Sequence, residues 1–212
     1  MSLVGKKFPG ITVDAISEMG DNLKINVFEE ATLNNKKVLL FWYPKDFTFV
    51  CPTELHAFQN ALSEFEKRNT TIIGASCDTN EVHFAWLNTP KDNGGIEGIT
   101  YPILADTNRN LSNILGILDI ESTSYSEETD FVIIEGSNVT YRATYLIDET
   151  GKIFHESVND MSLGRNVNEF LRMIDAYIHI QEKGEVCPAN WEAGKEGMNA
   201  DRLSTAAYLA QN

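Results

Sequence analysis

Short apolar runs bounded by turn residues recur along the chain and predict β-strands. The predicted strands are residues 23–28, 38–43, 70–77, 143–147 and 152–158. Residues 38–43 are almost continuously apolar, whereas a strand with one solvated face alternates apolar and polar positions. We therefore expect residues 38–43 to form a central strand that is covered on both faces.

Apolar residues at helical spacing lie between these runs. The predicted helices are residues 52–68, 81–87, 109–115 and 167–180. In the first of them an apolar stripe recurs at intervals of three and four, and it consists of Leu55, Phe58, Leu62 and Phe65. Because strands and helices alternate along the chain, we predict a layered α/β domain.

Two segments depart from this alternation. Residues 119–130 are polar and acidic, which indicates a surface excursion. We expect it to lead into a β-hairpin whose strands, residues 131–134 and 139–141, are joined by a turn at residues 136–138. Residues 181–212 are rich in Gly, Glu, Asn and Ala, and we interpret them as an arm that leaves the core and packs in a suitable context, such as on another subunit.

Composition and charge narrow the classes of function. A length of 212 residues fits one domain with an extension and excludes a large multidomain enzyme. With 17 basic and 31 acidic residues the net charge is −14, so we expect neither nucleic acid nor a membrane surface as a partner. The longest apolar run is too short to span a bilayer, and the first residues lack the apolar core of a signal peptide. We therefore expect a cytoplasmic protein.

Cysteine and histidine usage exclude further classes. Three cysteines, Cys51, Cys77 and Cys187, are too few and too widely spaced for a secreted disulfide scaffold. The absence of Cys-x-x-Cys argues against a zinc ribbon and a thioredoxin-type dithiol. The histidines are not clustered at metal-ligand spacing, so no metal site is predicted, and His56 and His83 are expected on helix surfaces.

The segment before residue 52 carries the strongest chemical signal. Pro52 suits the first position of a helix, which places Cys51 at the helix N-terminus. Free backbone N–H groups and the positive end of the helix dipole stabilise a thiolate there, and the thiolate is the nucleophilic form of cysteine. Thr48, three residues earlier, places a hydroxyl near the sulfur. The alternative is that Cys51 is merely a buried capping cysteine.

Pro44, Thr48 and Cys51 match the Pro-x-x-x-Thr-x-x-Cys motif of the peroxiredoxins, and residues 41–54 resemble the two-cysteine, alkyl hydroperoxide reductase C type. The resemblance runs nearly from end to end, through residues 85–87, 101–103, 142–144, 148–152, 159–160, 164–165 and 184–191. It implies a thioredoxin-like α/β fold with a central mixed sheet flanked by helices. It also implies a peroxidase domain over residues 1–180 and a C-terminal arm over residues 181–212.

By this resemblance Cys51 is the peroxidatic cysteine, which attacks the peroxide and becomes a sulfenic acid. Arg142 occupies the position of the active-site arginine, and Glu54 resembles the glutamate that holds this arginine in an ion pair. Pro44 and Thr48 complete the catalytic motif. The competing interpretations are a solvated strand-end charge for Arg142 and favourable helix-dipole placement for Glu54.

Five further residues are assigned by the resemblance to the pocket or its surroundings. Arg165 is a second arginine near the site, and Trp86 packs beside the active-site loop, although core packing alone also explains Trp86. Tyr43 and Phe49 are expected to wall off the pocket and keep it dry, and Val50 is assigned to the pocket or its surroundings.

Cys187 resembles the resolving cysteine of the family, which belongs to the partner subunit and condenses with the sulfenic acid to a disulfide. The alternative is an idle thiol in the arm. Cys77 ends a predicted strand and is expected to be structural.

The resemblance also implies partners. Peroxides are the substrates, and thioredoxin or a disulfide-reducing flavoprotein of the alkyl hydroperoxide reductase system is the electron donor. The protein is expected to form a homodimer that assembles into a decameric ring, and no bound cofactor is required. A holdase chaperone is a second hypothesis from a different class. A protein disulfide oxidoreductase is disfavoured because Cys-x-x-Cys is absent.

Overall fold

The computed structural model describes residues 2–211 and contains two compact units. The first unit ends at Arg165, and the second begins at Asn166. The boundary expected after residue 180 lies inside helix α6, Val167–Lys183. The functional division into a peroxidase domain and an arm remains a prediction.

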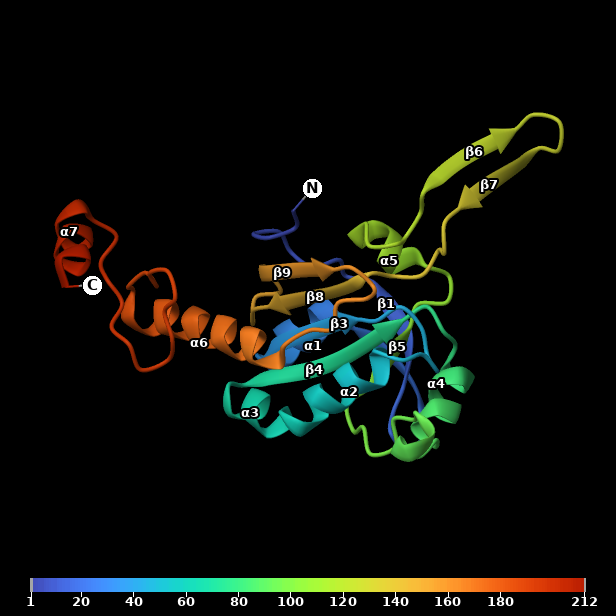
Figure 1. The fold of residues 1–212 in the computed structure, drawn as a ribbon, viewed down its shortest axis with the longest axis horizontal. Coiled ribbons are helices and arrows are strands. Elements are labelled where there is room, and N and C mark those ends of the chain that lie inside the picture. Colours follow the sequence, from blue (N-terminus) through green and yellow to red (C-terminus); the bar gives the residue numbers. More distant parts are fainter. Residues whose placement is uncertain (1, 212) are drawn as a thin grey trace. The chain divides into compact units, whose positions relative to one another are not determined.

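A seven-stranded mixed sheet forms the centre of the first unit (Figure 1). Its strands, in spatial order, are β2 (Asn22–Asn26), β1 (Thr12–Ile16), β5 (Ile103–Ala105), β4 (Thr70–Ser76), β3 (Lys37–Trp42), β8 (Arg142–Ile147) and β9 (Ile153–Asn159). Strand β3 pairs parallel with β4 and antiparallel with β8. Every residue of β3 is buried, which confirms the prediction of a central strand.

Helices α1 (Val27–Asn34), α2 (Cys51–Asn60), α3 (Leu62–Lys67), α4 (Asn80–Leu87) and α5 (Asn110–Leu115) accompany this sheet, with a short 3₁₀ helix at Lys91–Asn93. Helix α1 contacts β3, α3 contacts β4, and α4 contacts β1 and β5. The expectation of a mixed sheet flanked by helices is therefore confirmed. The helix predicted over residues 52–68 is interrupted at Ala61, whose φ of −97° and ψ of 3° leave the helical range.

Strand β2 ends earlier than predicted because a helix starts inside the same apolar run. The side chain of Asn26 accepts a hydrogen bond from the backbone N–H of Glu29 and thereby caps α1. Strands β1 and β5 were not predicted, since β1 alternates weakly and β5 has only three residues.

The hairpin of the first unit lies elsewhere in the sequence than predicted. Strand β6, Ser122–Ser126, pairs antiparallel with β7, Phe131–Glu135, and the two project away from the main sheet in Figure 1. The expected hairpin between residues 131–134 and 139–141 is wrong. Thr140 instead bridges Leu118, so residues 139–141 return the chain to the core while the polar segment supplies the first hairpin strand.

The second unit contains α6 (Val167–Lys183) and α7 (Arg202–Gln211). Asn166 caps the start of α6, and Gly184 ends it in a left-handed conformation with a φ of 67°. An isolated bridge between Val186 and Met198 closes the chain segment between the two helices. Among residues 2–211, the structure contains no helix that is long and apolar enough to cross a membrane.

Candidate active site

Cys51 is the first residue of α2, as the position of Pro52 predicts, and its side chain is 1% exposed. Helix α2 follows a loop that leaves the end of β3, so the cysteine lies at the junction of a central strand and a helix N-terminus. The preceding residue, Val50, makes no side-chain capping bond. Cys51 therefore lies in the first turn of the helix, where the positive end of the helix dipole acts.

Arg142 reaches the Cys51 sulfur from the first position of β8. Its Nη1 lies 3.5 Å from Cys51 Sγ and also donates to Glu54 Oε2. Its Nε donates to the carbonyl oxygen of Met161 at 2.7 Å. The antiparallel pairing of β8 with β3 is what brings Arg142 to a cysteine 91 positions away in sequence.

Glu54 joins two buried guanidinium groups. Its Oε1 accepts hydrogen bonds from the backbone N–H and Nε of Arg165 at 2.9 and 2.8 Å, and its Oε2 accepts from Arg165 Nη2 at 2.9 Å. The Arg165 guanidinium also lies over the ring of Phe41, 5.1 Å from its centroid. Two cations and one anion leave one positive charge in excess in a buried cluster. This excess positive charge lies beside the Cys51 sulfur, which Arg142 Nη1 approaches to 3.5 Å.

These contacts bear on the competing interpretation of Arg142 as a solvated charge and on the surroundings of Glu54 and Arg165. Arg142, Glu54 and Arg165 are each no more than 9% exposed, so none of them is a solvated surface charge. The structure brings all three together at Cys51, in the ion-pair arrangement that was expected of Glu54 and Arg142. Their catalytic roles remain part of the proposal below.

Pro44 and Thr48 lie on the loop between β3 and α2. Pro44 is buried, and Thr48 is partly exposed. The Thr48 hydroxyl donates to the carbonyl oxygen of Lys45 at 2.9 Å, so in this conformation the hydroxyl is engaged by its own loop rather than by the sulfur. Its Oγ accepting capacity is still free for a substrate O–H.

The expected pocket walls are only partly found. Phe49 is 93% exposed within this chain and therefore does not enclose a pocket there, which corrects the prediction. Tyr43 is fully buried, but its hydroxyl donates to Asp46 rather than pointing at Cys51, and burial raises its pKa well above the usual value. Val50 is half-buried, directly before Cys51.

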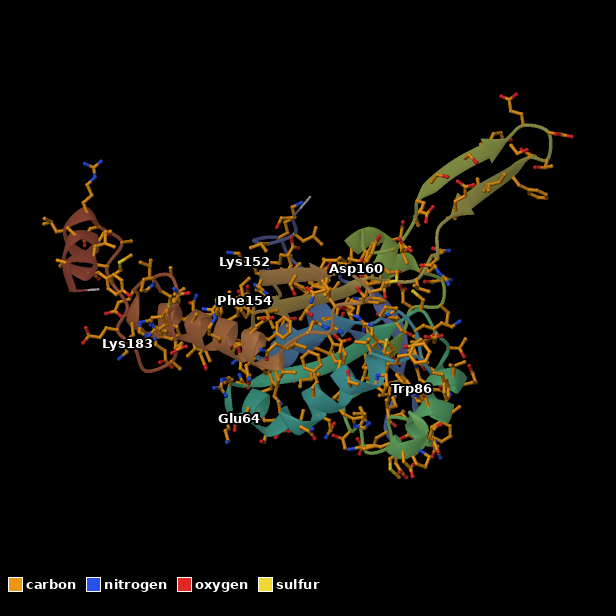
Figure 2. The ribbon with its side chains drawn as sticks, viewed as in Figure 1. Glu64, Trp86, Lys152, Phe154, Asp160 and Lys183 are labelled. Carbon is orange, nitrogen blue, oxygen red and sulfur yellow. The ribbon has the colours of Figure 1, made fainter. Side chains whose placement is uncertain are left out.

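Trp86 packs beside the loop that carries Phe47. It lies on α4 (Figure 2), is fully buried, and donates its indole N–H to the carbonyl oxygen of Gly94 at 2.9 Å. Its ring lies 5.8 Å from that of Phe47 and 5.9 Å from that of Tyr43. Both interpretations of Trp86, core packing and support of the loop, are therefore compatible with its contacts.

His83 is not on a helix surface, contrary to the prediction. It is completely buried, with Nδ1 2.7 Å from Asp46 Oδ2 and Nε2 3.2 Å from the carbonyl oxygen of Leu104. Sequence reasoning missed both His83 and Asp46. A usable signal was present, because His83 precedes the buried Trp86 and Leu87 by three and four positions and so shares their helix face.

Comparison with known proteins decides the family. The family model described as AhpC/TSA matches residues 4–156, and that of the C-terminal domain of 1-Cys peroxiredoxin matches residues 178–210. The chain belongs to the AhpC/TSA family. It is similar to alkyl hydroperoxide reductase C of Helicobacter pylori strain 26695, with 39% identity over 99% of this chain and 98% of that protein. The corresponding protein of Buchnera aphidicola from Baizongia pistaciae is 42% identical, over 99% of this chain and 97% of the relative.

A solved structure supports the same assignment. The reduced 2-Cys peroxiredoxin of Plasmodium vivax superposes with a TM-score of 0.87 at 36% identity, covering 99% of this chain and all of that one. The thioredoxin-like α/β fold expected for this peroxiredoxin is thereby confirmed.

The remaining cysteines of this peroxiredoxin have environments unlike that of Cys51. Cys187 lies in the second unit, where its Sγ is 3.6 Å from the carbonyl oxygen of Ala176, and partial burial raises the pKa of its thiol. Cys77 lies 3.7 Å from the hydroxyl of Ser112, and burial raises its pKa to about 11. All three cysteines are free thiols in this structure.

Proposed function

We propose that this peroxiredoxin reduces hydrogen peroxide and small organic hydroperoxides, with Cys51 as the peroxidatic cysteine. The observation that supports this most directly is the 3.5 Å approach of Arg142 Nη1 to a buried cysteine sulfur at a helix N-terminus. An excess guanidinium charge and a helix dipole together favour the nucleophilic thiolate at this position.

The proposed reaction is an in-line displacement. The Cys51 thiolate attacks one peroxide oxygen, an S–O bond forms as the O–O bond breaks, and the leaving oxygen takes up a proton to become water or an alcohol. The sulfur is oxidised to a sulfenic acid while the peroxide is reduced by two electrons. Negative charge grows on the leaving oxygen, so N–H donors aimed at it lower the barrier. Arg142 and the backbone N–H groups beside Cys51 supply such donors, and Thr48 accepts a bond from the substrate O–H.

Other residues shape the site without bonding to the sulfur. Glu54 holds Arg142 at its buried position and is itself fixed by Arg165. Pro44 and Val50 belong to the loop between β3 and α2, and Trp86 packs against Phe47 of the same loop. Phe49 and Tyr43 do not line a pocket within one chain in the expected way, although an exposed Phe49 is available to a neighbouring subunit.

Turnover requires a second thiol and an external reductant. We propose that Cys187 of the partner subunit attacks the sulfenic acid, forming an intersubunit disulfide and releasing water. Thioredoxin or a disulfide-reducing flavoprotein then reduces this disulfide, in a homodimer that assembles to a decamer. A reducing cytoplasm suits such a cycle, whose physiological purpose is antioxidant defence and redox homeostasis.

A cysteine series tests this function. Cys51→Ser should abolish dithiol-dependent peroxide consumption, whereas the matched control Cys77→Ser should keep it. Cys187→Ala should complete one turnover and then accumulate sulfenic acid, which a dimedone label detects. Full peroxidase activity in Cys51→Ser overturns the assignment, and sustained turnover in Cys187→Ala removes the resolving role from Cys187.

A further inference from the structure

Asp46 fixes the loop between β3 and α2 through one bond within the loop and two bonds to other segments. Tyr43, beside the end of β3, donates its hydroxyl to Asp46 Oδ1 at 2.8 Å. His83 of α4 lies 2.7 Å from Asp46 Oδ2. The backbone N–H of Asp46 donates to Asp78 Oδ2, after β4, at 2.9 Å. Asp46 and His83 are 3% and 0% exposed, so these bonds lie in the protein interior.

The hydrogen-bonding geometry of His83 and Asp46 shows how many protons this pair of side chains shares. A carbonyl oxygen only accepts, so His83 Nε2 carries the hydrogen that it donates to Leu104. At 2.7 Å, His83 Nδ1 and Asp46 Oδ2 also need a proton between them. A neutral imidazole and an ionised carboxylate together carry a single N–H proton. The pair of His83 and Asp46 therefore carries one additional proton. That proton resides either on the imidazole, as an imidazolium, or on the carboxyl group.

The surroundings of the pair favour its retention of this proton. Burial raises the pKa of Asp46, and the negative charge of Asp78 acts in the same direction, while His83 and the hydrogen bond from Tyr43 oppose both. Burial also raises the pKa of Tyr43, which thus remains a neutral donor to Asp46. Among the residues that the structure describes, Tyr43 and Asp78 are the titratable groups that hydrogen-bond to or electrostatically shift Asp46 besides His83.

Asp46, which these bonds hold in place, directly precedes Phe47, a residue with a strained backbone conformation. Phe47 has a φ of 54°, in the left-handed region that a bulky side chain disfavours. Such a conformation persists only where the surrounding structure enforces it. Here the buried bonds of Asp46 fix the backbone on one side, and the Phe47 ring rests against Trp86. Thr48 and Cys51 follow within four positions, so the anchor sets where the reactive end of the loop lies.

We propose that Asp46 and His83 are positioning residues whose shared proton holds the loop of residues 43–50 in the geometry that Cys51 needs to react with peroxide. The inference rests on the proposed peroxidase function, because it concerns the placement of the same cysteine. Neither residue touches the sulfur. A displacement of about 1 Å at a reacting centre costs on the order of 10²-fold in rate, so loss of the anchor should be easily measurable.

Two substitutions at position 46 distinguish the loss of the hydrogen bonds that hold the loop from the loss of the shared proton alone. Asp46→Ala removes the side-chain bonds of Asp46 to Tyr43 and His83 and leaves the 3.4 Å contact between the Tyr43 hydroxyl and His83 Nδ1. Asp46→Asn keeps them, because its amide oxygen accepts from Tyr43 while its NH₂ donates to Nδ1 of a neutral imidazole. The asparagine therefore preserves the anchor and removes its need for an extra proton.

The matched control is Asp106→Ala. Asp106 is 2% exposed and accepts the backbone N–H groups of Leu111 and Ser112, so its loss also removes a buried carboxylate with its bonds. Those bonds cap α5 rather than the loop before Cys51. Asp106→Ala should therefore destabilise the fold while leaving the chemistry at Cys51 unchanged.

The experiment measures the second-order rate constant of Cys51 oxidation by hydrogen peroxide in a single turnover, followed by tryptophan fluorescence. Asp46→Ala should lower it about 10- to 100-fold, Asp46→Asn should stay within about 3-fold of the parent, and Asp106→Ala should match the parent. Equal rate constants for Asp46→Ala and the parent protein would overturn the proposal. A parent protein that consumes no peroxide overturns the proposed function instead.

Two further measurements distinguish a shared proton from a purely structural role of Asp46 and His83. The parent rate should fall on the alkaline side as the pair loses its proton, and Asp46→Asn should lack this fall. Nitrogen-15 spectra of the His83 ring should show either an imidazolium or the Nε2–H tautomer in the parent. A neutral Nδ1–H tautomer, or the same alkaline fall in Asp46→Asn, contradicts the shared proton.

Discussion

At the scale of single residues, Glu54 organises the site. One buried carboxylate receives hydrogen bonds from two guanidinium groups, and one of these extends to the Cys51 sulfur. Removing one partner of a buried ion pair leaves an uncompensated charge in a medium of low dielectric constant. The stability of this site and the placement of Arg142 therefore depend on the same side chain.

We expect Glu54→Gln to lower the free energy of unfolding by about 3–5 kcal/mol, because two buried cations then lack their anion. Glu64 of α3, which is labelled in Figure 2, is a matched control, since it also bonds two cations, Lys67 and Arg68, but its side chain is 43% exposed. Glu64→Gln should leave the denaturation midpoint unchanged in urea titrations followed by circular dichroism. Equal small effects at both positions would show that burial does not govern these pairs.

Cys77 should titrate far above neutral pH. Because burial raises its pKa to about 11, the thiol stays protonated at pH 7–8, where thiolate chemistry is slow. In the Cys51→Ser, Cys187→Ser double variant, alkylation of Cys77 by iodoacetamide should accelerate only as the pH approaches 11. The raised pKa means that the folded state holds this proton more tightly than the unfolded state. The associated stability is thus present below the ordinary thiol pKa and is lost as the pH rises toward 11.

Rapid alkylation of Cys77 at pH 8 would contradict this picture, provided that the protein is still folded by circular dichroism. The triple variant Cys51→Ser, Cys77→Ser, Cys187→Ser supplies the blank for the assay, because it retains none of the three cysteines.

At the scale of elements, the short loop between β3 and α2 and the β6–β7 hairpin differ in how firmly the rest of the fold holds them. The loop carries a strained Phe47 and is secured by buried polar side chains. The hairpin exposes Phe131, Val132, Ile133 and Ile134 on β7, with exposed fractions between 47% and 68%. A two-stranded ribbon gains little stability by itself. The hairpin therefore contributes surface rather than core, and its exposed apolar strand is an aggregation liability.

Replacing residues 123–134 by an Asn-Gly turn should leave the thermal midpoint of the protein within about 2 °C, because few buried contacts are lost. The replacement is geometrically feasible, since Ser122 and Glu135 are paired and a two-residue turn closes such a pair. Thermal unfolding by circular dichroism measures the midpoint. The single variant Ile133→Thr is the control with the hairpin retained. A drop of 10 °C or more would mean that the hairpin packs against something in the native assembly.

At the scale of the whole molecule, the two thiols that the proposed cycle joins belong to different units. Cys51 lies in the first unit, and Cys187 lies in the second, after α6. Their disulfide would need both Cα atoms within about 7 Å and hence local unwinding around Cys51, which is fully buried at the start of α2. The net charge of −14 makes the buried positive cluster around Glu54 a local exception to an acidic molecule.

Mixing two variants tests whether the disulfide joins two subunits. Cys51→Ser and Cys187→Ser should each fail to form a disulfide with peroxide. After subunit exchange, a mixture of the two should form a covalent dimer on a nonreducing gel, because Cys51 of one chain then meets Cys187 of the other. Absence of this dimer, when the parent protein forms an intramolecular disulfide, would favour a bond within one chain.

Patterns among neighbouring residues were sufficient to predict much of the fold. The continuous apolar run of β3 and the helix N-terminus at Cys51 depend on near neighbours, and both predictions are confirmed. The apolar stripe predicted for one helix is instead divided between α2 and α3 at Ala61. The hairpin was misplaced because the polar strand β6 has no periodicity of its own and is defined by its partner β7. Strand β5 was missed for a related reason, as its three residues become a strand by pairing with β1 and β4.

The residues of the site divide in the same way, into those that the local sequence identifies and those that only tertiary contacts bring into place. Cys51, Pro44 and Thr48 lie within eight positions, so their motif is legible along the chain, and the resemblance then pointed to Arg142, Glu54 and Arg165. Only the pairing of β8 with β3 shows that Arg142 reaches the sulfur, and only the packing of α4 turns His83 inward onto Asp46. Contacts between residues tens of positions apart are set by strand order and helix packing, which no local spacing encodes. The same separation explains why Phe49 was expected in a wall and lies in solvent, since a side chain's surroundings are made by the rest of the fold.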